Sequence, residues 1–81
     1  MEQEATFGHV LRRIRDAQDI SQETLAFESG VSRSFLARLE TGLQQPTLRT
    51  VFKLAHGLGM SASALIAEVE RELKAPEKGP N

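Results

Sequence analysis

Apolar side chains recur along this chain at intervals of three and four residues, which is the spacing of an amphipathic helix. No alternating run of β-branched residues is long enough to favour a strand instead. The pattern therefore predicts an all-α fold of five helices. We expect these helices at about residues 6–18, 22–29, 33–41, 48–58 and 62–74.

The helix starts carry a signature that occurs three times: a serine with an apolar residue before it and another four positions after it. A serine hydroxyl can accept a hydrogen bond from the first turn of a helix, and the two apolar residues can pack over that turn. The serines are Ser21, Ser32 and Ser61, and Thr47 is the expected cap of the fourth helix. We therefore expect a helix to begin directly after each of these residues.

Glycines indicate where the second and third helices end. Gly30 stands where the chain must leave one helix and enter the next within about three residues, and glycine adopts the left-handed conformation of such a turn without strain. Gly42 follows the third helix in the same way, and Pro46 prevents that helix from continuing. Two short helices joined by a tight glycine turn form a helix-turn-helix unit.

The apolar stripes of the last two helices predict association of the chain with itself. The expected inward residues are Val51, Phe52, Ala55 and Leu58, then Leu65, Ile66, Val69 and Leu73. A four-helix core can cover the start of the second stripe but not its far end at Val69 and Leu73. We therefore expect a homodimer built mainly by the fifth helix with help from the end of the fourth. The alternative is that the fifth helix folds back onto its own domain.

Length and composition place the chain among small globular proteins. Its 81 residues allow one domain, and 40% apolar with 26% charged residues is ordinary for such a domain. We expect residues 1–75 to form the domain and residues 76–81 a disordered tail. There is no cysteine, and no apolar run approaches the roughly 18 residues of a membrane span, so a cytoplasmic protein without a membrane partner is expected.

Charged and titratable residues favour binding over catalysis. The net charge is −1, but residues 5–60 carry seven Lys/Arg and five Asp/Glu, so the acidic excess lies at the two ends. This distribution permits a local basic face without by itself indicating DNA. His9 and His56 are far apart and have no ligand cluster, and no nucleophile has a recognisable base. We expect no metal, no cofactor and no enzymatic activity.

The third helix has an outer face that suits the major groove of DNA. Its outward residues are expected to be Arg33, Ser34, Ala37, Arg38 and Thr41. Small side chains permit close approach to the bases, and two arginines can reach guanine edges or phosphates. The following loop has no lysine or arginine, so phosphate contacts there must come from its amides or its backbone. Phe27 lies off the inner stripe, while Phe35 is expected to pack over Leu39 rather than lie along a sugar-phosphate backbone.

At these residues the chain resembles the XRE family, the helix-turn-helix proteins that include Cro and the lambdoid phage repressors. The resemblance covers roughly residues 7–58. Its elements are Phe7-Gly8, Leu11-Arg12, Arg15, Ser21-Gln22, Leu25-Ala26, Ser29-Gly30-Val31-Ser32, Glu40-x-Gly42 and Pro46-Thr47. It implies a five-helix bundle like that of the phage repressors, with the third helix as the DNA reader.

The resemblance also implies roles for single residues. Gln22 matches a residue that contacts backbone phosphate and steadies the recognition helix, and Ser32 matches a position near the backbone. Arg33, Ser34 and Arg38 match positions that face base edges. Arg15 and Glu40 resemble a pair that ties the first helix to the end of the third. The predicted DNA-binding set is Gln22, Ser32, Arg33, Ser34, Arg38 and Thr41.

The resulting expectation is a transcriptional regulator, such as a repressor, that binds double-stranded DNA as a dimer on a two-fold operator. RNA polymerase and a toxin-type protein are further candidate partners. Three circuits stay open: a restriction-modification controller, a phage-type repressor or a DNA-binding antitoxin. The alternative of another class is a protein-interaction module that uses the same fold without binding DNA.

Overall fold

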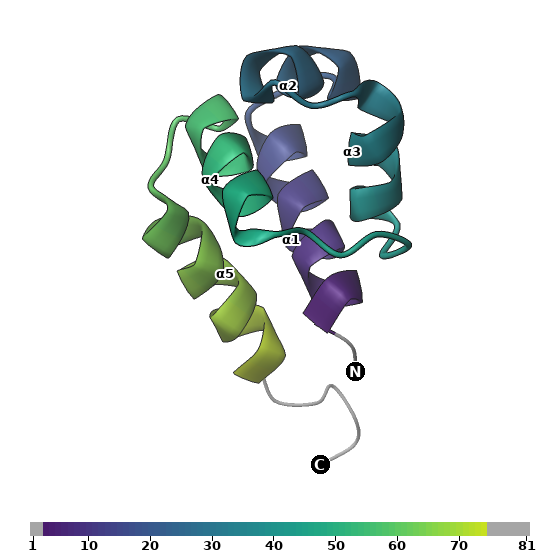
Figure 1. Ribbon diagram of the computed structural model, residues 1–81. Helices are drawn as coiled ribbons and strands as arrows, with labels where there is room; N and C mark the ends of the chain where they lie inside the picture. Colours follow the sequence, from purple (N-terminus) through teal and green to yellow (C-terminus); the bar gives the residue numbers. More distant parts are fainter. Residues whose placement is uncertain (1–2, 75–81) are drawn as a thin grey trace.

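Five helices make up the part of the protein that the computed structural model describes, residues 3–74, and no strand occurs within it (Figure 1). The helices are α1 (Gln3–Ala17), α2 (Gln22–Ser29), α3 (Arg33–Glu40), α4 (Leu48–Gly57) and α5 (Ala62–Lys74). The predicted all-α fold of five helices is confirmed, although α1 begins three residues earlier than expected, at Gln3 rather than Thr6. The predicted tail, residues 76–81, lies outside the described residues.

The predicted caps form at the starts of α2 to α5. The side-chain oxygens of Ser21, Ser32 and Thr47 each accept a hydrogen bond from the backbone N–H three residues on, at 3.0–3.1 Å. Ser61 accepts the equivalent bond from Ala64 at 3.1 Å. Each bond satisfies an N–H that the first turn of a helix would otherwise leave unpaired.

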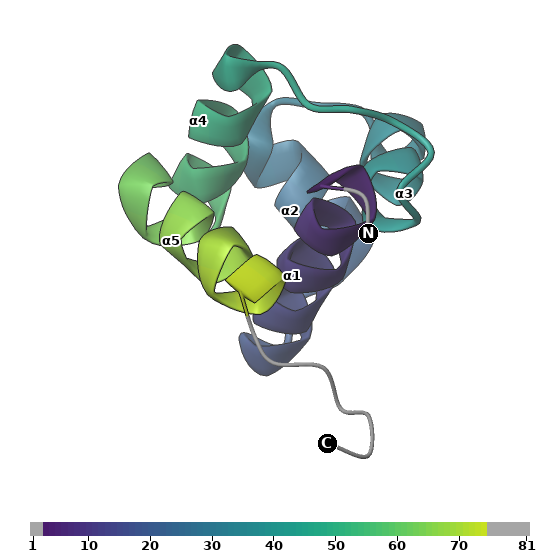
Figure 2. The same ribbon diagram turned by 90° about the horizontal axis from the view of Figure 1, so that it is seen from below.

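Helix α1 lies at the centre of the bundle. Seen from below, α3 lies on one side of it and α5 on the other, and both pack against it (Figure 2). Helix α2 crosses one end and packs on α3 and α4, while α4 also packs on α5 (Figure 1). The largest fully buried side chains are Leu11, Leu25, Leu36, Leu39, Leu54, Leu65 and Val10. Every helix contributes at least one of them, so the core is shared by all five.

Two glycines let pairs of helices approach closely. A Cβ on Gly8 of α1 would collide with the carbonyl oxygen of Leu39 in α3. A Cβ on Gly57 would likewise collide with the hydroxyl of Ser29, at the crossing of α4 and α2. The missing side chains therefore set how near α1 lies to α3 and how near α4 lies to α2.

The prediction that Phe52 points inward is wrong. Its side chain is 58% exposed, and Leu54 is buried in its place. The buried set on α4 is Val51, Leu54 and Ala55, followed by Leu58 in the cap. These positions follow the three- and four-residue spacing of one helix face. Each residue of a helix is rotated by roughly 100° from the one before it, so Phe52, which follows Val51, points away from that face.

The expected exposure of the far end of α5 is also wrong in part. Val69 is 7% exposed and belongs to the core, because α5 packs lengthwise along α1 as well as against α4. Ile66 and Leu73 keep 40% and 37% exposure, so the stripe is split between the core and the surface. Most of α5 has folded back onto its own domain, as the alternative interpretation proposed.

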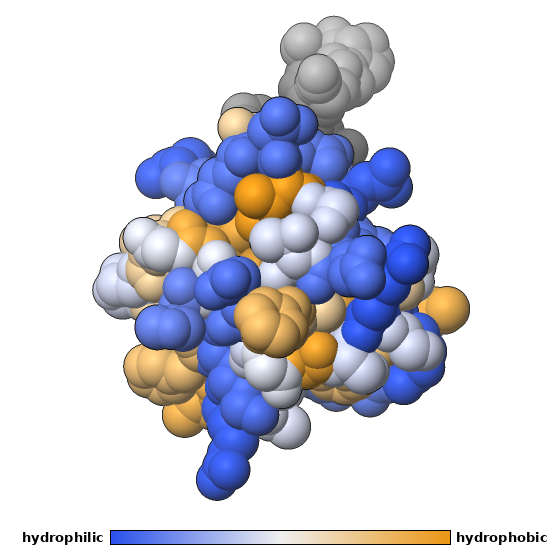
Figure 3. Space-filling model, turned by 90° about the horizontal axis from the view of Figure 1, so that it is seen from above, coloured by the Kyte–Doolittle hydropathy of each residue, from blue (hydrophilic) through white to orange (hydrophobic). Residues whose placement is uncertain are grey.

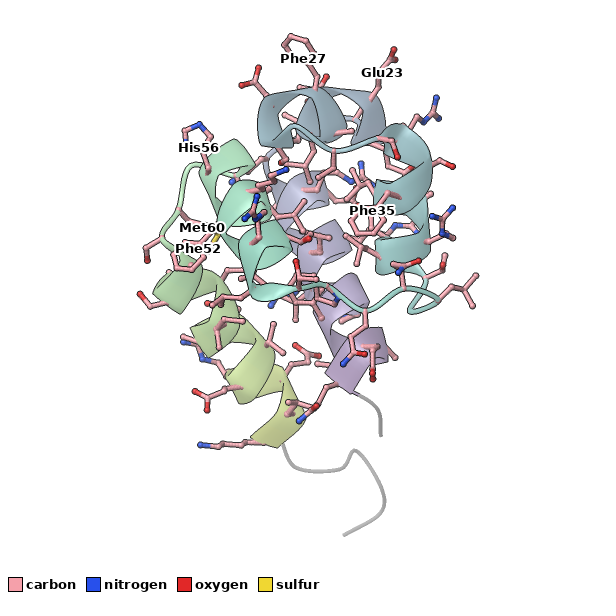
Figure 4. The ribbon with its side chains drawn as sticks, in the orientation of Figure 1. Glu23, Phe27, Phe35, Phe52, His56 and Met60 are labelled. Atoms are coloured by element: carbon pink, nitrogen blue, oxygen red, sulfur yellow. The ribbon has the colours of Figure 1, made fainter. Side chains whose placement is uncertain are left out.

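Phe35 and Phe27 differ in their surroundings. Phe35 is half-buried and packs against the core, which confirms the expected packing (Figure 4). Phe27 is 82% exposed on the outward side of α2.

Among residues 3–74, no single helix is long and apolar enough to cross a membrane. Helices α4 and α5 reach that length only together, and they are bent by 103° relative to each other.

Candidate nucleic-acid interface

Helices α2 and α3 form the predicted helix-turn-helix, joined at Gly30. This glycine has φ of +73° and ψ of +32°, the left-handed conformation that residues with a Cβ rarely adopt. The backbone N–H of Val31 then donates to the carbonyl of Ala26 at 3.0 Å, which closes the end of α2. The turn places the start of α3 directly beside the end of α2.

One face of α3 is buried and the opposite face is open to solvent. Leu36, Leu39 and Glu40 lie on the buried face. Arg33, Ser34 and Arg38 are exposed, as is Thr41 in the cap that follows. The structure therefore brings four of the six predicted DNA-binding residues onto one outward surface, with Ser32 exposed at its beginning.

The two hydroxyls at the ends of α3 already have structural roles. Ser32 Oγ accepts the capping bond from Phe35, which leaves its own O–H able to donate to a phosphate. Thr41 Oγ1 donates to the carbonyls of Ala37 and Arg38, at 3.2 Å each. While that bond holds, Thr41 can offer DNA only its lone pairs and its methyl group.

Arg15 and Glu40 form the ion pair that the resemblance implied. Arg15 Nε and Nη2 donate to the two carboxylate oxygens of Glu40 at 2.7 and 3.0 Å, and Nη1 donates to the carbonyl of Ile20 at 2.9 Å. The Glu40 side chain is only 3% exposed. The hydrogen bond to Glu40 raises the pKa of Arg15 above its ordinary value, despite partial burial. This bidentate pair fixes the end of α3 against α1.

Gln22 joins the same network. Its Nε2 donates to Glu40 Oε1 at 2.9 Å, so the buried carboxylate contacts both the first residue of α2 and the arginine of α1. The bond orients the Gln22 amide and leaves one of its N–H groups for another acceptor. Sequence reasoning predicted that Gln22 steadies α3 and that Arg15 pairs with Glu40. It did not identify Glu40 as the partner of Gln22, because the relative position of these two residues depends on the angle between α2 and α3.

A second contact that sequence reasoning missed lies at the other end of the exposed face. Arg38 Nε donates to Oε1 of Gln44, in the connection between α3 and α4, at 3.3 Å. The sequence had indicated only that amides of this loop would face the backbone of DNA. The structure instead places one of these amides against a predicted base-contacting arginine.

This fold and this surface define a helix-turn-helix protein in which α3 has an exposed face that carries two arginines. Residues 11–65 match the family model described as helix-turn-helix. The chain therefore belongs to that family, in its XRE type, and is a DNA-binding transcriptional regulator.

The chain is also similar to individual proteins and solved structures. The chain is similar to control protein C.MunI of Mycoplasma sp, with 31% identity covering 82% of this chain and 90% of that protein. Its structure is similar to that of the restriction-modification controller protein C.AhdI from Aeromonas hydrophila, with 41% identity, a TM-score of 0.73 and coverage of 75% and 92%. The clp gene regulator ClgR from Corynebacterium glutamicum is similar at 25% identity, with a TM-score of 0.83 and coverage of 95% and 99%.

Proposed function

We propose that this regulator binds a two-fold operator in the cytoplasm by placing α3 in the major groove, and that it acts by binding rather than by catalysis. The observation that carries the proposal is the outward surface of α3. Arg33 and Arg38 are exposed there, while the buried face of the same helix is held by Leu36, Leu39 and Glu40. Arginine forks match the O6 and N7 acceptors of guanine, so the two arginines are the proposed base readers.

Selection of bound sites from a random DNA pool, followed by binding isotherms, tests this proposal. Arg33→Ala and Arg38→Ala should each lower affinity for the selected site by about 1–3 kcal/mol and relax the preference at one base pair. Both variants should stay folded, because the two side chains are exposed. Equal losses on selected and scrambled DNA would leave only phosphate contact and contradict base reading.

Gln22 is proposed to position the protein on the DNA backbone. Its oriented amide, held by Glu40, can donate its remaining N–H to a phosphate. Gln22→Ala should lower affinity by the same factor on every sequence, and the selected bases should not change. A changed base preference in site selection would contradict this role.

We further propose a homodimer, with an interface that differs from the sequence expectation. The exposed apolar side chains of this region are Leu48 and Phe52 on α4, at 73% and 58%, and Ile66 and Leu73 on α5, at 40% and 37%. Leu48 and Phe52 lie one helical turn apart and share a face. A second copy is the proposed occupant, because a two-fold pair would bury this apolar surface and set two reading helices about 34 Å apart.

Sedimentation at micromolar concentration tests the dimer. The Phe52→Glu, Ile66→Glu double variant should be monomeric and should bind a palindromic site more weakly than the parent. Phe27→Glu is the control, since it adds a charge at a phenylalanine on α2 that is even more exposed than Phe52. A monomeric parent, or a double variant that still dimerises, would rule out this interface.

Control of a restriction-modification system is the circuit that the comparisons favour. The chain is 31% identical to C.MunI and 41% identical to C.AhdI, and it spans 90% and 92% of those two control proteins. Neighbouring genes test the assignment. A methyltransferase and an endonuclease gene are expected beside the gene for this protein, and a toxin gene there would favour the antitoxin circuit instead.

The outward side of α2 favours a protein contact as a second function. Phe27 and Glu23 both project from it, and the view onto α2 shows apolar atoms surrounded by hydrophilic ones (Figures 3 and 4). Glu28 is exposed beside Phe27, so the complementary partner has an apolar recess bordered by basic side chains. RNA polymerase at the adjacent promoter is the proposed partner.

Phe27→Ser tests this contact. The variant should lower activated transcription without changing DNA affinity, and unchanged transcription would contradict the contact.

A further inference from the structure

The contact between Arg38 and Gln44 joins the exposed surface of α3 to the connection that follows it. Arg38 Nε donates to Gln44 Oε1 at 3.3 Å. Arg38 is exposed, whereas Gln44 is partly buried in the connection. The amide is therefore the less mobile partner, and the guanidinium is the group whose direction the bond restricts.

The connection that carries Gln44 is fixed by its backbone. The N–H of Leu43 donates to the carbonyl of Arg38 itself at 2.9 Å, and the N–H of Gly42 donates to Leu39 at 3.2 Å. Gly42 has φ of +80° and passes so close to α1 that a Cβ there would lie 3.2 Å from Cα of Ala5. The connection is thus held to both α3 and α1, which places Gln44 at a defined position beside Arg38.

The bond uses a guanidinium N–H that a guanine does not need. Arginine has five N–H donors, and the fork that matches guanine O6 and N7 can be formed by the two terminal nitrogens. With Nε occupied by Gln44, both terminal nitrogens of Arg38 remain free to face a base. An arginine without this partner loses more rotamer freedom when it binds.

We propose that Gln44 is a positioning residue that directs Arg38 toward a single guanine, so that base preference at that position depends on a loop amide. The proposal rests on the proposed function, because it assigns a helper to one of the two base readers. The positioning role is assigned to Gln44 and not to its exposed neighbour Gln45, which therefore serves as the matched control.

Binding isotherms on the selected site and on a site with that guanine replaced provide the first test. Arg38→Ala identifies the guanine as the base pair at which discrimination is lost. Gln44→Ala should lower discrimination at this base pair by about twofold to tenfold, which is the range that one such hydrogen bond supports, and leave other positions unchanged. Gln44→Glu keeps an acceptor for Nε, so it should retain the discrimination while lowering affinity on all sequences. Gln45→Ala should retain the discrimination at this base pair.

A loss of equal size on every sequence in Gln44→Ala would show that Gln44 contacts phosphate and would overturn the proposal. Discrimination that is unchanged in Gln44→Ala would overturn it as well. A parent protein that fails to bind DNA would contradict the proposed function instead, so a DNA-free measurement is needed. In NMR spectra of the free protein, the Nε–H signal of Arg38 should exchange more rapidly with water in Gln44→Ala than in Gln45→Ala. Equal exchange would overturn the positioning role.

Discussion

Helix α1 carries two arginines, two residues apart, that connect it to different helices in different environments. Arg15 faces α3 and forms a bidentate pair with Glu40, with side chains that are 10% and 3% exposed. Arg13 faces α5 and contacts Glu68 at 3.1 Å, with side chains that are 44% and 28% exposed. Glu68 is shared with Arg71 at 2.6 Å, and His9 and Arg13 both lie near Glu72.

The two pairs have similar N···O distances but differ in burial. We therefore expect burial, rather than the N···O distance, to decide how much each ion pair matters for stability. Removing one partner of the buried pair leaves a charge without water or counter-ion, whereas water replaces a lost partner at the surface. The buried pair also holds Gln22, so the ion pair and the residue proposed to contact the DNA backbone meet at Glu40. The α5 side of α1 relies instead on apolar burial at Leu65 and Val69.

The largest expected effect comes from breaking the buried pair. Glu40→Ala should destabilise the domain by about 3–5 kcal/mol in urea unfolding, because it leaves Arg15 buried without its partner. Glu28→Ala, at an exposed glutamate of α2, is the control and should stay within about 0.5 kcal/mol of the parent. The double variant Arg15→Met, Glu40→Leu should lose less than Glu40→Ala alone; a larger loss would contradict the role of the unpaired charge.

A smaller effect is expected from opening the α1–α3 contact itself. Gly8→Ala should destabilise by about 1–3 kcal/mol, because the new methyl group collides with the backbone of Leu39. The higher helix propensity of alanine opposes this loss by about 1 kcal/mol. Thermal unfolding of the parent and of the variant measures which of these two opposing effects is larger. A variant more stable than the parent would show that α1 can move away from α3 without cost.

On the α5 side of α1, Arg13→Ala should have a weak effect that depends on salt. Its ion pairs are exposed, so we expect Tm to fall by less than about 4 °C at low ionic strength, and by less again at high salt. Arg12→Ala is the matched control, since within residues 3–74 the ion pair of Arg12 is with Asp16 of its own helix, at 3.7 Å. A salt-independent loss from Arg13→Ala would contradict the comparison between the two sides of α1.

The smallest expected effect is the pH dependence at Glu68. Hydrogen bonds from Arg71 and then Arg13 hold the pKa of Glu68 below its ordinary value. A lowered folded pKa stabilises the protein at neutral pH, and this contribution is lost as the pH falls through that folded pKa. Glu68→Gln should therefore be slightly less stable than the parent at neutral pH and equal to it at strongly acidic pH. A difference in stability that persists in acid would have another cause.

Local signals in the sequence were sufficient to predict the helices and the outward face of α3. A capping hydroxyl at Ser21 or Ser32 and the turn at Gly30 act within a few residues, so their consequences do not depend on the rest of the fold. The face of α3 follows from helical periodicity once Leu36 and Leu39 are inside. These features were predicted correctly for that reason.

What the sequence could not predict depends on how whole helices are rotated and docked. Phe52 and Leu54 are both apolar, and only the orientation of α4 against the core decides which of them is buried. Coverage of Val69 depends on α5 lying along α1. The contacts from Gln22 to Glu40 and from Arg38 to Gln44 need two segments placed to within the length of a hydrogen bond. No local pattern encodes such a distance.

The central position of α1 also has a consequence for the order in which the chain folds. Its contacts with Glu40 and Glu68 join residues 25 and 55 positions apart, whereas the turn between α2 and α3 closes within a few residues. Closing longer loops costs more chain entropy before any contact compensates for it. We therefore expect α2, α3 and α4 to assemble early and the α1–α5 contact to form last, so that a nascent chain keeps one side of its first helix uncovered until its fifth helix has been made.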